Sequence, residues 1–154
     1  RDARATYYVV LVDLVDPSNE KLAKLYSTEF YRNVEARLAP ECVMVTQATS
    51  TFFSPHAFST VASTVATSQP DRQILPFSTN IPSFGEWGFV LSTRTPQNLI
   101  SQPLPKGLTY QDRKTLEFIM RTKPARTEFM EPSTLLHPRI VEVYNQDMRQ
   151  WRYY

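Results

Sequence analysis

The sequence predicts an α/β protein in which two parallel strands with crossover helices are followed by an antiparallel edge hairpin, and three observations lead to this class. A continuous apolar run, "VVLVD", precedes a segment whose apolar residues have helical spacing. A second apolar run, "CVMV", precedes a second helical segment. Two extended runs then flank a tight turn, "SFGE". With 154 residues, 42% of them hydrophobic, the chain is long enough for one sizeable core.

The first strand is expected at 9–13, because a run of β-branched and apolar residues without alternation is typical of a strand covered on both faces. Residues 17–19, "PSN", supply a turn and a cap, so a helix is expected after them. Its apolar positions recur with helical spacing and are Leu22, Leu25, Tyr26, Phe30, Val34 and Leu38. Pro40 is expected to end this helix.

The second strand is expected at 42–48, and a helix over 55–67 follows it. One face of that helix would carry Phe58, Val61, Ala62 and Val65. The connections are short enough for right-handed crossovers between parallel strands. The runs at 74–82 and 87–93 predict an antiparallel hairpin that closes one edge of the sheet. Together these elements make one unit over residues 1–94.

Residues 95–154 are expected to form a linker and a carboxyl-terminal extension, because Pro, Gln, Asn and Ser are dense up to Leu108. A helix is predicted over 110–121, with Leu116, Ile119 and Met120 facing inward. "RIVEVYN", residues 139–145, predicts a short strand. The aromatic end of the chain is expected to cover the domain or to make a dimer contact; it contains Trp151, Tyr153 and Tyr154.

Composition and charge argue against several classes of protein. The formal net charge is +2, and residues 1–93 carry seven Lys/Arg against nine Asp/Glu. Since no basic run interleaved with aromatics is present, no nucleic-acid partner is expected. His56 and His137 lack metal-ligand spacing. Cys42 lies in an apolar run, which indicates a buried thiol in a reducing compartment. No apolar stretch reaches the roughly 18 residues of a membrane span.

Two carboxylates and an amide follow the ends of the first two predicted strands. Asp13 and Asp16 come at the end of the first, and Gln47 at the end of the second. Ligands of open α/β sheets bind past the carboxyl ends of parallel strands, so these side chains are expected to share one rim. A protonated amine suits such a rim, because an anion attracts it and can also accept its proton. From spacing alone, a structural role remains open for each: a cap or loop bonds for the acids, and loop bonds for the amide.

Four motifs in order carry a family resemblance. "YYVVLVDLVDP" resembles a "YDVIIVD-x-x-DP" stretch of the spermidine synthase family, the polyamine aminopropyltransferases. "LAKLYSTEFYRNVEARLAP", "VMVTQATS" and "IPSFGEWGFVL" follow in the order of that family. The sequence is most similar to a branch that has "DLPDP" and "PSFGEWGF" and is often fused to a membrane region. The resemblance covers residues 7–92 and implies the carboxyl-terminal half of a Rossmann-like, methyltransferase-type domain.

This resemblance also implies an activity in polyamine biosynthesis. In that family an aminopropyl group passes from decarboxylated S-adenosylmethionine, the co-substrate, to putrescine, a small diamine. Asp13 matches the acid that takes the proton from the attacking amine, and Asp16 matches the acid that holds the substrate amine. Gln47 matches a substrate-side glutamine, and Phe84 stands at a wall position where many members have a tyrosine. No metal or tightly bound cofactor is implied, because the sulfonium is already a good leaving group.

The sequence departs from the family on the nucleotide side. Members begin the fold with a glycine-rich turn that holds the adenosyl group, but the chain has only three glycines, at positions 85, 88 and 107. We therefore expect this chain to be inactive alone, with the nucleotide half supplied by a missing segment or a partner chain. Either way a homo-oligomer, such as a homodimer, is expected, because half a sheet leaves an open edge. The resemblance implies the cytoplasm, or the cytoplasmic face of a membrane within a longer fused chain.

Two other interpretations remain open at the level of sequence. One is a noncatalytic binding or assembly module derived from the same fold. The other is a methyltransferase-like protein that acts on a different amine, since the family shares that fold.

Overall fold

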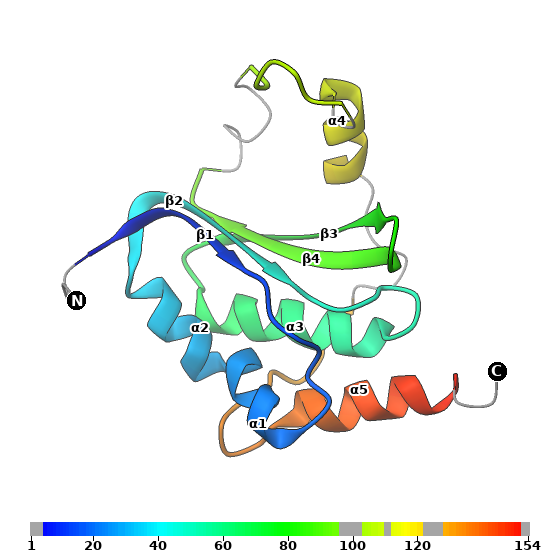
Figure 1. The fold of residues 1–154 in the computed structure, drawn as a ribbon. Helices are drawn as coiled ribbons and strands as arrows, with labels where there is room; N and C mark the ends of the chain where they lie inside the picture. Colours follow the sequence, from blue (N-terminus) through cyan, green and yellow to red (C-terminus); the bar gives the residue numbers. More distant parts are fainter. Residues whose placement is uncertain (1–4, 96–102, 110–111, 122–127, 152–154) are drawn as a thin grey trace.

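The computed structural model of the chain describes residues 5–95, 103–109, 112–121 and 128–151. Its elements follow one another along the chain as shown in Figure 1. They are β1 (Tyr7–Val12), α1 (Glu20–Ala23), the 3₁₀ turn η1 (Lys24–Tyr26), α2 (Thr28–Glu35), β2 (Leu38–Gln47), α3 (Pro55–Ser68), β3 (Gln73–Ile81), β4 (Gly85–Thr93), α4 (Arg113–Arg121) and α5 (Arg139–Arg149). The predicted α/β class is confirmed.

The strands form one sheet in the order β1-β2-β4-β3. β1 and β2 are parallel, with Val12 opposite Thr46, so both strands end at the same edge of the sheet. β4 pairs antiparallel with both β2 and β3. The predicted crossover and the predicted hairpin are therefore both present, and the hairpin places β3 at one edge.

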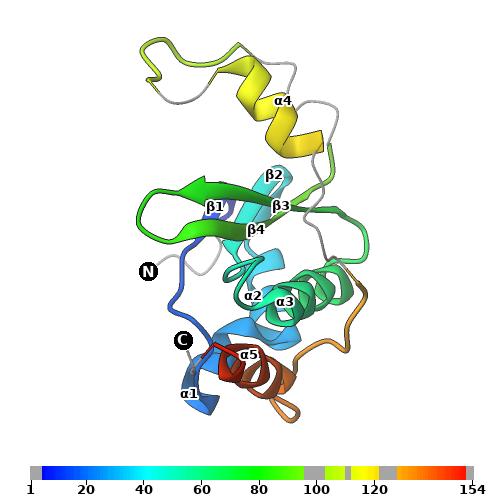
Figure 2. The same cartoon turned by 90° about the vertical axis from the view of Figure 1, so that its right-hand side faces the viewer.

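Helices cover the two faces of the sheet unequally. α2 and α3 lie against one face, and α5 packs on α3 from the far side, whereas α4 lies on the opposite face next to β3 (Figure 2). α3 is buried along most of its length, because the sheet and α5 enclose it. The core between these layers includes Tyr31, Met44, Phe58 and Val90. On the other face of the sheet, Val9 and Leu11 of β1 are exposed within the described part of the chain, and the candidate site lies there.

The prediction that the first strand is covered on both faces is wrong. β1 is an edge strand, and Tyr8, Val9 and Leu11 are 71%, 65% and 74% exposed. Val12 is buried, because it points toward the helices. The apolar run predicts a strand correctly, but within the described part of the chain helices cover only one face of that strand.

The single helix predicted after residue 19 is interrupted and ends early. The Asn19 side chain caps α1 as expected, by accepting from the amides of Lys21 and Leu22. Ser27 then adopts an extended conformation and caps α2 through the amide of Phe30. α2 stops at Glu35, and β2 already begins at Leu38, so Leu38 and Pro40 belong to the strand. Pro40 is tolerated because it lies in the irregular stretch before the regular β1–β2 pairing starts at Val43.

The predicted strand at 139–145 is also wrong, because this segment lies in α5. Ile140, Val143, Tyr144 and Asp147 recur at spacings of three, one and three, and therefore share one helical face. Ile140 and Val143 are buried in the core. The alternation of valines suggested a strand, but the buried face follows the helical period.

The remaining predictions for the carboxyl-terminal part have mixed outcomes. The helix predicted over 110–121 exists as α4, and its predicted inward side chains are half-buried. The Trp151 ring covers Phe52 and Phe53, with centroids 5.3 and 5.2 Å apart. Tyr153 and Tyr154, like residues 96–102 of the predicted linker, lie outside the described residues. Within the described ranges, no helix combines the length and the apolar character needed to cross a bilayer.

Candidate functional site

Asp13, Gln47 and Phe84 line one cavity on the open face of the sheet. The cavity has a volume of about 320 Å³ and lies at the shared end of β1 and β2. Its other walls are apolar or aromatic side chains, namely Leu11, Val12, Val45, Ile81, Trp87 and Phe89. Asp13 is the charged member of this lining, and the Phe84 and Trp87 rings lie 5.2 Å apart beside it. Three of the four site residues predicted from sequence thus line this cavity.

Asp16 does not line this cavity and is directed toward the helical layer. The Tyr144 hydroxyl of α5 donates a hydrogen bond to Asp16 Oδ2 at 2.9 Å. Burial raises the pKa of the Asp16 carboxyl, while hydrogen bonds from Tyr144 and Gln47 oppose that rise. These donors favour the charged form of a carboxylate that burial alone would disfavour.

Gln47 is a buried hub whose side-chain amide has partners in four segments of the chain. Its Nε2 donates to the Leu14 carbonyl at 2.5 Å and to the Tyr26 hydroxyl at 2.6 Å. Its Oε1 accepts from the Thr49 amide at 2.8 Å and from Trp87 Nε1 at 3.2 Å. The side-chain amide therefore has protein partners at both ends, and it ties the residues after β1 to β4.

Tyr26 holds the same segment from the helical side. Its hydroxyl donates to the Val15 carbonyl at 2.9 Å and accepts the Gln47 amide bond. Burial and the nearby carboxylates of Asp16 and Asp13 raise the pKa of the Tyr26 phenol, so it stays a neutral donor. The two residues between Asp13 and Asp16 are thus each fixed through the backbone, which holds the two acids in place.

A close approach of backbone to helix positions the aromatic wall. An added Cβ at Gly88 would lie 2.4 Å from a Phe58 ring carbon and 2.9 Å from the Thr49 carbonyl oxygen. The Gly88 amide donates to that same carbonyl at 2.7 Å, and Thr49 has a φ of 67°. Only glycine leaves β4 room at this point, and Trp87 is the adjacent residue.

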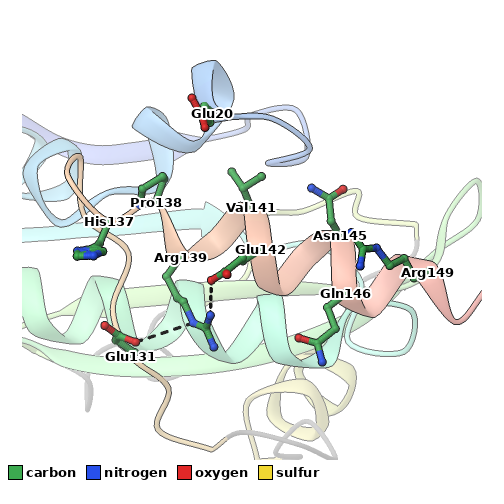
Figure 3. Close-up of a pocket in the computed structure, with 10 residues that line it drawn as sticks. All are labelled: Glu20, Glu131, His137, Pro138, Arg139, Val141, Glu142, Asn145, Gln146 and Arg149. Carbon is green, nitrogen blue, oxygen red and sulfur yellow. Dashed lines mark hydrogen bonds and ion pairs between the residues drawn. The ribbon is translucent and has the colours of Figure 1, made fainter.

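A larger hollow of about 890 Å³ lies elsewhere, between α5 and the segments near α1 (Figure 3). It is lined largely by charged and polar side chains, and neither Asp13, Asp16 nor Gln47 belongs to it. Figure 3 shows Arg139 between Glu131 and Glu142, to which it is ion-paired. The central cation of this hollow is neutralised by its own neighbours, whereas Asp13 and Gln47 line the smaller cavity, so we assign the chemistry to the smaller cavity.

Sequence reasoning missed two residues of this region. One is Trp87, which lies within "SFGEWGF". Residues two positions apart on a strand share one face, so the spacing of Trp87 and Phe89 was the available signal that both side chains face the cavity. Tyr144 was placed on a strand, and the helical spacing of its neighbours was the available signal. In the described part of the chain, no group of three or more His, Cys, Asp or Glu side chains could hold a metal ion.

Comparison with known proteins identifies relatives over nearly the whole chain. The spermine/spermidine synthase domain matches residues 1–102. Polyamine aminopropyltransferase 1 of Streptomyces coelicolor is 38% identical over 159 residues, which cover 100% of this chain and 29% of that protein. The polyamine aminopropyltransferase of Mycobacterium tuberculosis is 37% identical over 149 residues, which cover 94% of this chain and 27% of that protein. The chain thus spans less than a third of the length of these relatives.

Solved structures share the fold. A spermidine synthase in complex with the transition-state analogue AdoDATO has a TM-score of 0.61 and 17% identity, over 77% of this chain and 43% of that chain. The spermidine synthase of Thermotoga maritima also has a TM-score of 0.61, with 16% identity over 77% of this chain and 42% of that chain. Since the family domain matches well over half of the residues and curated relatives match almost all of them, this chain belongs to the spermine/spermidine synthase family.

Proposed function

We propose that this chain supplies the amine-binding and proton-accepting part of an aminopropyltransferase site. One observation carries the proposal: Asp13 lies at the carboxyl end of β1 and lines a cavity whose other walls, apart from Gln47, are apolar and aromatic. The carboxylate would attract one ammonium group of a diamine such as putrescine, and the walls would contact its methylene chain. An indole face adds a cation–π attraction of about 0.5–2 kcal/mol for an ammonium group.

In the proposed reaction, Asp13 acts as general base in the cavity. Asp16, three residues further along the chain and outside the cavity lining, would anchor the second ammonium group of the diamine. The amine loses a proton to the Asp13 carboxylate, and its nitrogen lone pair attacks the carbon next to the sulfonium of decarboxylated S-adenosylmethionine. The carbon–nitrogen bond forms while the carbon–sulfur bond breaks, and methylthioadenosine leaves with the electron pair. The chain's contribution is positioning and electrostatics. Phe84 would form part of the wall.

For Gln47 we propose an indirect role, because its amide already has four protein partners. It would serve the site by holding the segment between Asp13 and Asp16. The direct substrate contact predicted from sequence stays a prediction.

The adenosyl half of the donor would be held by residues outside this chain. Two observations support this: the chain spans 29% of its Streptomyces coelicolor relative, and its three glycines all follow α3. Under this proposal the 154 residues bind a diamine but do not turn it over alone. We also infer a reducing, cytoplasmic setting, which the buried free thiol of Cys42 supports.

Isothermal titration calorimetry with putrescine, and separately with methylthioadenosine, tests this proposal. We expect putrescine binding that weakens at least about tenfold in Asp13→Asn and in Asp16→Asn, and no binding of the nucleoside. Glu86→Gln is a matched control, because Glu86 is an exposed carboxylate in the hairpin that bonds Ser78 and does not line the cavity. Absence of putrescine binding, or an equal loss in Glu86→Gln, would contradict the proposal.

A noncatalytic assembly module is the second candidate, and the exposed edge of β1 favours it. Tyr7, Val9 and Leu11 are all more than half exposed on a strand that pairs only with β2 within the described sheet. Unpaired edges with apolar side chains favour association. Light scattering would show a dimer that Val9→Lys dissociates, and lack of diamine binding by that dimer would favour this function over catalysis. The homo-oligomer expected from sequence is a proposal on the same grounds.

A further inference from the structure

One hydrogen bond joins the carboxyl-terminal helix to the segment that follows β1. The Tyr144 hydroxyl lies 2.9 Å from Asp16 Oδ2, although the two residues are 128 positions apart in sequence. Residue 144 also lies outside the stretch that the family domain matches, which is 1–102. Nothing in the conserved-domain match therefore accounts for this contact.

α5 holds Tyr144 rigidly, because two kinds of contact fix the helix. Ile140 and Val143 are buried in the core on the same helical face. Asp147, 3% exposed, accepts hydrogen bonds from the amides of His56 and Ala57 at the start of α3, both at 3.0 Å. The contacts that hold the Tyr144 hydroxyl next to Asp16 therefore involve neither Asp13 nor Asp16.

A phenol is well suited to orient a carboxylate that must still bind a cation. A Lys or Arg partner would neutralise Asp16 and compete with an ammonium ligand, whereas a neutral donor leaves the negative charge in place. The groups that face Asp16 are the phenols of Tyr26 and Tyr144 and the amide of Gln47. None of these groups carries positive charge.

We propose that Tyr144 is a positioning residue that fixes the orientation of the Asp16 carboxylate, so that the carboxyl-terminal helix is a working part of the amine site. This inference rests on the proposed role of Asp16 as the amine anchor. The hydrogen bond also opposes the rise that burial causes in the pKa of Asp16. Tyr144 acts through Asp16 and is not itself a catalytic residue.

Tyr144→Phe removes the hydroxyl and keeps the ring. Calorimetric titration with putrescine between pH 5 and pH 8 should show a dissociation constant about five- to tenfold higher at pH 7, because the Asp16 carboxylate loses one of the donors that orient it. The pH below which binding is lost should move upward, because the Asp16 carboxylate would protonate more readily. Tyr31→Phe is a matched control: its buried hydroxyl bonds Thr46 and contacts neither aspartate.

A second measurement does not depend on any ligand. Carbon-13 NMR of the aspartate carboxyls should show the Asp16 titration moving to higher pH in Tyr144→Phe and staying unchanged in Tyr31→Phe. Putrescine binding by the wild type with an unaltered affinity, pH profile and Asp16 titration in Tyr144→Phe would overturn this inference alone. No putrescine binding by the wild type would overturn the proposed function, and the positioning role with it.

Discussion

The Gln47 hub makes a quantitative prediction for Gln47→Glu, a nearly isosteric change. The Gln47 amide donates two hydrogen bonds, to Leu14 O and the Tyr26 hydroxyl, at 2.5 and 2.6 Å. An ionised carboxylate cannot donate either bond and places a charge in a site where Gln47 is only 4% exposed. A buried charge without a cationic partner costs about 3–5 kcal/mol, so we expect the free energy of unfolding to fall by that amount at pH 8.

At low pH the same variant should recover part of this loss. A protonated carboxyl has one O–H donor, so it replaces one of the two lost bonds and leaves a deficit of about 1–2 kcal/mol. The introduced group has a higher pKa in the folded protein than in the unfolded chain, so the folded state binds more protons. Its stability is therefore retained below the ordinary glutamic acid pKa of about 4.3 and falls as the pH rises, by at most about 1.4 kcal/mol per pH unit.

Urea unfolding of the wild type and of Gln47→Glu at pH 4.5 and pH 8 measures this difference at each pH. Gln47→Leu is the control, because it abolishes all four bonds without adding a titratable group; its deficit of about 2–5 kcal/mol should change less between the two pH values than that of Gln47→Glu. A deficit of Gln47→Glu that is equal at both pH values, or below about 0.5 kcal/mol at pH 8, would refute the assignment of Gln47 as a donor hub.

Two further predictions concern the scaffold, and thermal or urea unfolding checks both. Gly88→Ala should destabilise the fold by about 1–3 kcal/mol, because the new methyl group overlaps the Phe58 ring. Phe58→Leu in the same chain should recover part of that loss. A Gly88→Ala variant as stable as the wild type would contradict the close approach. Asp147→Ala should cost about 2–4 kcal/mol, because the amides of His56 and Ala57 lose their acceptor, while Asp147→Asn, which keeps an acceptor, should cost about 1 kcal/mol. Equal costs for the two changes would show that the carboxylate does not cap α3.

Elements whose pattern is local could be predicted from the sequence. The second strand, the helix after Pro55 and the hairpin around "SFGE" all appear where their periodicity placed them. Each depends on residues within a few positions of one another, and so does the Asn19 cap. The signal for the helix break at Ser27 was also local, because serine is a common N-cap residue and Ser27 caps α2. The continuous helical spacing of the apolar residues hid that signal.

Only part of the candidate site could be predicted from local sequence. Asp13 and Gln47 could be placed together, because the carboxyl ends of adjacent parallel strands meet at one edge. The partners of the Gln47 amide come from four segments of the chain, and no spacing rule relates them. For the same reason Asp16 could not be separated from Asp13 by sequence, although the two side chains face different surroundings.

The α/β class, most element positions and the family follow from the sequence, because local backbone preferences and ordered motifs depend on short stretches of residues. The tertiary structure alone decided that β1 is an edge, that residues 139–149 form a helix and that Tyr144 reaches Asp16. These features depend on which surfaces find a covering partner, and burial is a property of the packed chain. A valine in an edge strand and a valine in a core strand have the same propensity, and only their neighbours in space distinguish them.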